Sequence, residues 1–293
     1  MKTILVPLIG QHDVENPLEV ERLALEAGFD LARRFEAHVK VVSLIDQPPA
    51  ASKKWPIWWP SGGASELLDW IDEVSEKRRK NAAAQYNAVV SAQDPQPLQT
   101  DSPTPGFTAH FTEQIGEVVV MLGPICRLAD LIVASAADTD WMGPFSPLVE
   151  EILRDAGKPL LVVPKDGAKA IGETVAIAWD GSAASARAAA AAMPFLREAR
   201  EIIVFSCDEG GKDDPDPADM VEYLEWHGLE AGSSHVKPGD QRPGPAIIDA
   251  ALERNCDLVV MGACLHSRAH RLVFGSMTEY VVDQPRIAAL LVP

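Results

Sequence analysis

Two glycines near the end of the sequence have the flanking residues of an anion-binding site. Gly262 follows a strand-like apolar run that ends at Met261, and Gly275 with Ser276 precedes a helix-like segment that starts at Met277. A glycine lets the backbone approach a ligand closely, and the free N–H groups at the start of a helix attract anions such as phosphate. These residues therefore predict a phosphate-binding turn.

An acidic residue stands where it could complete such a site. Trp179, Asp180, Gly181 and Ser182 directly follow an apolar strand-like run at residues 174–178. The Asp180 carboxylate could accept hydrogen bonds from the hydroxyl or amino groups of a ligand. Alternatively, Asp180 or Ser182 only caps the helix that follows. Because parallel strands bring their carboxyl ends to one edge of a sheet, we expect Trp179 and Asp180 to lie close to Gly262.

Basic residues occupy the segment between the two glycines. His266 and Arg268, followed by His270 and Arg271, could face the phosphates as cations, or they form a solvated basic loop. His266 and His270 also have the i, i+4 spacing of a helical metal pair, but no third ligand accompanies them. We therefore expect no metal site.

Strand and helix patterns alternate twice along the chain. The expected strands of the first half are residues 2–6, 39–43, 107–111, 130–134 and 160–163, with helices at 20–31, 67–89 and 113–128. The expected strands of the second half are residues 174–178, 201–206, 233–236, 257–261 and 287–292, with helices at 183–196, 218–226, 245–254 and 277–282. This predicts an α/β fold of two tandem doubly wound domains, 1–166 and 172–293, each a five-stranded parallel sheet with helices on both faces.

The bulk composition limits the partners. The chain has 293 residues and a net charge of −17, which argues against a broad nucleic-acid surface. Its four cysteines are scattered, and no apolar run has the length of a membrane span or a signal peptide. We expect a cytoplasmic protein with no nucleic-acid or membrane partner. Three tryptophans within residues 47–63 are interpreted as packing against the protein's own surface or as an oligomer contact.

The motif around the glycines resembles the nucleotide-binding motif G-x2-G-x9-G-[ST] of the universal stress protein family. Gly262 and the Gly275-Ser276 pair match it, whereas the middle glycine is Leu265. The loop at Asp180 resembles the first-strand loop of that family. The whole chain resembles the tandem form with two fused domains, and this implies an adenine nucleotide alpha hydrolase-like fold.

The resemblance also implies roles for the site residues. Asp180 would contact the nucleoside half of ATP, and Gly262 with Gly275 and Ser276 would contact phosphate and ribose. If the backbone at Leu265 needs a left-handed conformation, the leucine costs about 1–2 kcal/mol, so binding would be weak. The set of expected nucleotide-binding residues is Trp179, Asp180, Met261, Gly262, Gly275, Ser276 and Met277, with His266 and Arg268 as phosphate-side cations.

The first half departs further from the motif. Its first strand runs into residues 7–10 with no Asp, and Phe145-Ser146-Pro147 stands in place of the later glycine turn. We therefore interpret this half as a structural or partner-binding copy that lacks a phosphate site.

Three functions are compatible with these features. The first is a stress-response protein that binds ATP weakly in the second domain, with Mg²⁺ accompanying the nucleotide, and is not a dedicated enzyme. The second is a nucleotide-free scaffold or protein-interaction module of the same fold. The third, an ATP-cleaving ligase or hydrolase, lacks an evident base, nucleophile or metal cluster. The resemblance further implies an intrachain pseudo-dimer of the two domains, and pairing into a homodimer is an open expectation.

Overall fold

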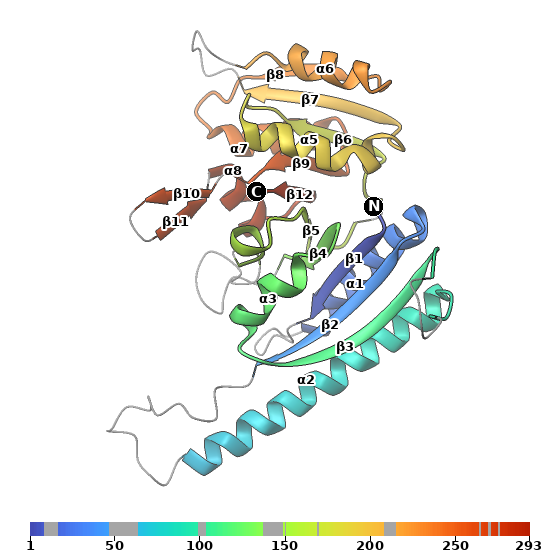
Figure 1. Ribbon diagram of the computed structural model, residues 1–293. Coiled ribbons are helices and arrows are strands. Elements are labelled where there is room, and N and C mark those ends of the chain that lie inside the picture. Colours follow the sequence, from blue (N-terminus) through green and yellow to red (C-terminus); the bar gives the residue numbers. More distant parts are fainter. Residues whose placement is uncertain are drawn as a thin grey trace. The chain divides into compact units, whose positions relative to one another are not determined.

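The chain folds into two compact units, Met1–Val133 and Ala134–Pro293. The computed structural model describes residues 1–8, 17–46, 64–98, 104–136, 149, 151–168, 170–207, 215–263, 265–268, 271–274 and 276–293 (Figure 1). Each unit contains a mostly parallel sheet flanked by helices. The predicted doubly wound α/β fold class is confirmed.

The first unit alternates strands and helices. Its elements are β1 (Thr3–Leu8), α1 (Pro17–Phe35), β2 (His38–Asp46), α2 (Ala64–Gln93), β3 (Thr108–Gly116), α3 (Val118–Cys126) and the first three residues of β4 (Leu131–Ser135). The strands are parallel and lie in the order β3-β2-β1-β4. β1 is apolar and buried at nearly every position, as expected of a central parallel strand.

Aromatic rings fix α1 and α2 on this sheet. Tyr86 of α2 lies 5.1 Å from Phe111 of β3 and 6.2 Å from Phe29 of α1, measured between ring centroids. α1 also comes very close to β1, because a Cβ added at Gly28 would lie 2.7 Å from Cγ2 of Val6. The glycine therefore permits this contact.

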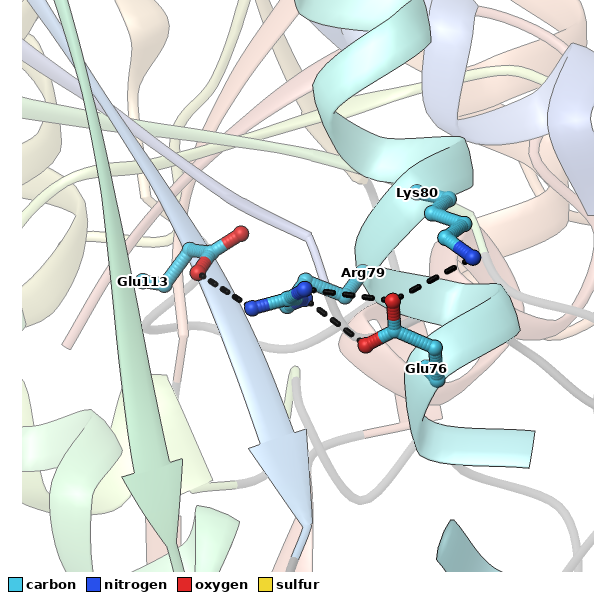
Figure 2. Close-up of polar contacts among 4 residues, drawn as sticks. All are labelled: Glu76, Arg79, Lys80 and Glu113. Carbon is cyan, nitrogen blue, oxygen red and sulfur yellow. Dashed lines mark hydrogen bonds and ion pairs between the residues drawn. The ribbon is translucent and has the colours of Figure 1, made fainter. Parts of the chain in front are cut away.

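A cluster of charged side chains joins α2 to β3 at the surface (Figure 2). Arg79 lies between two carboxylates, with its Nε 3.0 Å from Glu76 Oε2 and its Nη1 3.9 Å from Glu113 Oε2. Lys80 also contacts Glu76, at 3.3 Å. Hydrogen bonds from Arg79 and Lys80 lower the pKa of Glu76. Exposed pairs of this kind stabilise a fold only slightly.

The second unit holds the larger sheet. Its elements are η2 (Ile152–Ala156), β5 (Leu160–Val163), β6 (Thr174–Ala178), α5 (Ala183–Leu196), β7 (Glu201–Cys207), α6 (Pro217–Trp226), β8 (Gly232–Val236), α7 (Pro243–Glu253), β9 (Leu258–Gly262), β10 (Leu265–Arg268), β11 (Arg271–Phe274), α8 (Ser276–Asp283) and β12 (Ala288–Val292). The strand order is β5-β12-β9-β6-β7-β8, and β10 with β11 forms a separate two-stranded sheet. The five strands from β12 to β8 are parallel.

β5 is the exception to the parallel arrangement. It pairs antiparallel with β12, with Leu290 opposite Leu161, and both strands are fully buried. In sequence β5 closes the first half of the chain and β12 closes the second. The final strands of the two halves are thus direct neighbours.

An aspartate begins the fourth strand of each half and holds the start of the first strand. Asp130 Oδ2 accepts hydrogen bonds from the N–H groups of Lys2 and Thr3, at 2.6 and 3.1 Å. Asp257 accepts from Gly172 at 2.6 Å and from Thr174 at 3.0 Å. The same local arrangement occurs twice, which supports the internal repeat seen in the sequence.

Most predicted elements occur within a few residues of their expected bounds, with one clear correction. The helix expected at 113–128 begins only at Val118, because residues 113–116 continue β3 in pairing with β2. The tryptophans of residues 47–63 and the turn at residues 145–147 lie outside the described residues. The expected domain bounds, 1–166 and 172–293, stay a prediction. Among the helices that the structure describes, none combines the length and apolar character needed to cross a bilayer.

Candidate functional site

The carboxyl ends of β6 and β9 form the core of the candidate site. The two strands are parallel neighbours, and Ile177 lies opposite Val260 in their register. Trp179 and Asp180 therefore leave the sheet beside Gly262. The sequence predicted this proximity because parallel strands bring their carboxyl ends to one edge of a sheet.

Asp180 organises the turn that leads into α5. Its Oδ1 accepts a hydrogen bond from the Ser182 N–H at 2.9 Å, and the Ser182 Oγ accepts from the Ser185 N–H at 3.1 Å as the N-cap of the helix. Partial burial raises the pKa of Asp180, but hydrogen bonds from Ser182 and Ser185 outweigh it and hold the pKa below its ordinary value. The carboxylate is therefore charged at neutral pH. The capping alternative holds for Ser182, while the Asp180 residue stays exposed.

Gly262 is needed for packing. A Cβ at this position would lie 2.6 Å from the carbonyl carbon of Ala184 and 2.7 Å from the backbone nitrogen of Ser185. The first turn of α5 thus occupies the space that a side chain would need. The close approach that the sequence predicted for a ligand is made here by the protein's own helix, which also brings the α5 N-terminus to the site.

Trp179 carries an unused hydrogen-bond donor. Its backbone N–H donates to the Phe205 carbonyl at 2.8 Å and extends the pairing of β6 with β7. Its indole Nε1 is buried and has no hydrogen-bond partner among the described residues. A buried N–H without a partner is costly, so a guest with an acceptor would be favoured there. Met261, another expected site residue, is only 2% exposed and belongs to the core.

Pro215 also reaches this turn, which the sequence did not indicate. Gly181 has a φ of +72°, and a Cβ on it would lie 3.3 Å from Cβ of Pro215. Ser206 Oγ, at the end of β7, donates to the Pro215 carbonyl at 2.6 Å. The positive φ explains why a glycine stands after Asp180.

The segment after Gly262 forms a hairpin rather than an open loop. β10 and β11 pair antiparallel, with Leu265 opposite Phe274 and His266 opposite Val273. Leu265 therefore has an extended backbone, and the left-handed cost considered for it does not arise. His266 and Arg268 both lie in β10, and His270 lies outside the described residues.

The start of α8 is positioned by α7. A Cβ on Gly244 would lie 2.9 Å from Cα of Met277, so the first turns of the two helices are in close contact. Ser276 is the first residue of α8, one position before the expected start at Met277, whereas Gly275 lies outside the described residues. Gly244 follows a proline near the start of α7, and this Pro-Gly pair was the sequence signal that could have indicated the close contact with α8.

Within the part of the chain that the structure describes, no three His, Cys, Asp or Glu side chains are placed to hold an ion. Cys126 and Cys256 are buried free thiols, and burial raises the pKa of Cys126 to about 12.

Comparisons with known proteins agree with this architecture. Residues 173–293 match the model of the universal stress protein family. The chain is similar to the structure of a universal stress protein from Archaeoglobus fulgidus DSM 4304, at 17% identity and a TM-score of 0.66, covering 99% of this chain and 97% of that chain. It is also similar to a functionally unknown protein from Pseudomonas aeruginosa PAO1, at 12% identity and a TM-score of 0.50, covering 99% of this chain and 92% of that chain. No curated protein sequence matches the chain significantly.

Proposed function

We propose that residues 173–293, the part of the chain that matches the universal stress protein family model, bind an adenine nucleotide, ATP, at the carboxyl edge of β6 and β9. The observation that carries the proposal is the meeting of Asp180 with Gly262 and the α5 N-terminus at one sheet edge. Asp180 would accept hydrogen bonds from the nucleoside, and the buried Trp179 Nε1 would donate a hydrogen bond to the nucleoside. Mg²⁺ would enter with the phosphates, because the described residues supply no metal cluster of their own.

The affinity is proposed to be weak. The hairpin β10–β11 occupies the segment that carries the phosphate motif, and its first residue is Leu265 in an extended conformation. A paired strand has fewer free backbone N–H groups to offer a phosphate than an open glycine loop has.

A nucleotide-free scaffold is the second candidate, and two contacts favour it. Gly262 is required by the approach of Ala184, and Asp180 is used in the turn before α5. Both residues therefore have structural roles that need no ligand.

Isothermal titration of the full chain with ATP and Mg²⁺ tests the choice between the two. We expect saturable binding at millimolar ATP, weakened in Asp180→Asn, which keeps one side-chain oxygen for the turn. Asp166→Asn is the matched control, because Asp166 is exposed and lies between the last strand of the first half and β6. If the wild-type chain shows no heat of binding, the nucleotide proposal is rejected and the nucleotide-free scaffold is the remaining function.

The organisation of the chain forms part of the same proposal. We propose that the first half is a second, degenerate domain of this fold and that the two halves form an intrachain pseudo-dimer. The antiparallel pairing of β5 with β12 and the repeated clamps at Asp130 and Asp257 support this. A homodimer, a cytoplasmic location and a regulatory rather than enzymatic role complete the proposal.

A further inference from the structure

Helix α6 presents aromatic side chains to solvent. Its core-facing residues Met220 and Leu224 are 3% and 0% exposed, whereas Tyr223 is 38% and Trp226 is 83% exposed. The rings of Tyr223 and His227 meet edge to face, with centroids 4.7 Å apart. Trp is usually well buried in folded proteins, and exposed Trp and Tyr side chains that lie together are enriched at interfaces.

The same face of α6 is acidic. Asp219 and Glu222 precede Trp226 by seven and four positions, which places all three on one side of the helix together with Tyr223. Neither carboxylate forms an ion pair with a Lys or Arg of the described chain. From Asp213 to Glu230 the sequence contains no Lys or Arg at all. We call the residues Asp219, Glu222, Tyr223 and Trp226 the α6 face.

We propose that the α6 face is a docking site for an arginine-rich segment of a partner protein. A guanidinium group stacks on the flat face of Trp or Tyr and forms paired hydrogen bonds with a carboxylate, and the α6 face offers both acceptors side by side. Aromatic anchors bordered by complementary charge are typical of protein interfaces.

The charge of the surface excludes other occupants. Nucleic acids and anionic lipid surfaces carry phosphates, which acidic side chains repel. A second copy of this chain would bring the same acidic face and a net charge of −17, so self-association through it is disfavoured.

Fluorescence anisotropy with a labelled peptide of eight arginines and the full chain tests the proposal at about 0.15 M salt. We expect Trp226→Ala to weaken binding about two- to fivefold through the lost stacking, with no change in thermal unfolding because the side chain is exposed. A peptide of eight lysines should bind the wild type more weakly than the arginine peptide, and this difference should shrink in Trp226→Ala.

A charge-matched control separates the α6 face from general attraction to an acidic protein. Asp219→Asn/Glu222→Gln should weaken arginine-peptide binding more than Glu73→Gln/Glu117→Gln, which removes the same charge from exposed positions of the first unit. Equal losses in the two double variants would overturn the proposal, as would unchanged binding in Trp226→Ala. Tighter binding of DNA or phosphatidylserine vesicles, or a dimer in sedimentation that Trp226→Ala dissociates, would assign the α6 face to a different occupant.

Discussion

Replacing Gly262 by alanine should destabilise the second unit. The added Cβ would lie 2.6 Å from the Ala184 carbonyl carbon, 2.7 Å from the Ala184 Cβ and 2.7 Å from the Ser185 nitrogen. Two of these three atoms belong to the backbone, so no side-chain rotation can relieve the contact. The first turn of α5 must move away from β9, although that helix is held by several buried alanines.

The expected cost follows from this geometry. Overpacking a core by one methyl group destabilises by about 1–3 kcal/mol. For a unit of this size each kcal/mol lowers the melting temperature by about 2–4 °C, so the loss should be about 2–12 °C. Differential scanning calorimetry and urea unfolding of the full chain would measure it.

Gly232→Ala provides the matched control. Gly232 lies on the edge strand β8, and its added Cβ would come no nearer than 4.0 Å to the Ile202 carbonyl oxygen. This variant should unfold like the wild type. If Gly262→Ala also unfolds at the wild-type temperature, the close approach of α5 to β9 is wrong, and the glycine would then have to be explained by a ligand.

Two further predictions concern aspartates. Asp257→Asn should lower the free energy of unfolding by about 1–3 kcal/mol, because the carboxylate accepts hydrogen bonds from three successive backbone N–H groups. If the first half repeats this arrangement, Asp130→Asn should also destabilise the protein, whereas the exposed control Asp166→Asn should not. Urea unfolding that finds Asp130→Asn as stable as the wild type would contradict the repeat. Burial raises the pKa of Asp130, but hydrogen bonds from Lys2 and Thr3 hold it below its ordinary value, so the folded state binds this proton at lower pH than the unfolded state. The stabilisation by Asp130 is therefore present at neutral pH and is lost as the pH falls through the lowered pKa. Urea unfolding from about pH 7 to about pH 3 should show that Asp130→Asn loses less stability on acidification than the wild type. Stability that falls equally with pH in both proteins would contradict this prediction.

The sequence by itself determined the alternation of strands and helices. Apolar runs such as Leu160–Val163 and Leu258–Gly262 are buried at almost every position, and hydrophobic periodicity is a local property that can be recognised without a structure. The proximity of Asp180 to Gly262 followed as well, because parallel strands of this fold bring their ends to one edge. The bound of α3 was missed, since the pairing of β3 with β2 decides where the strand ends.

Only the tertiary structure decided what the individual site residues contact. The sequence marked Gly262 as a place of close approach, but whether a phosphate or a helix approaches depends on α5, whose first residue lies seventy-nine positions earlier in the chain. Similarly, the conformation of Leu265 depends on its pairing with Phe274. The contact between Gly262 and Ala184 joins residues that are far apart in sequence, and local pattern contains no information about the distance between them.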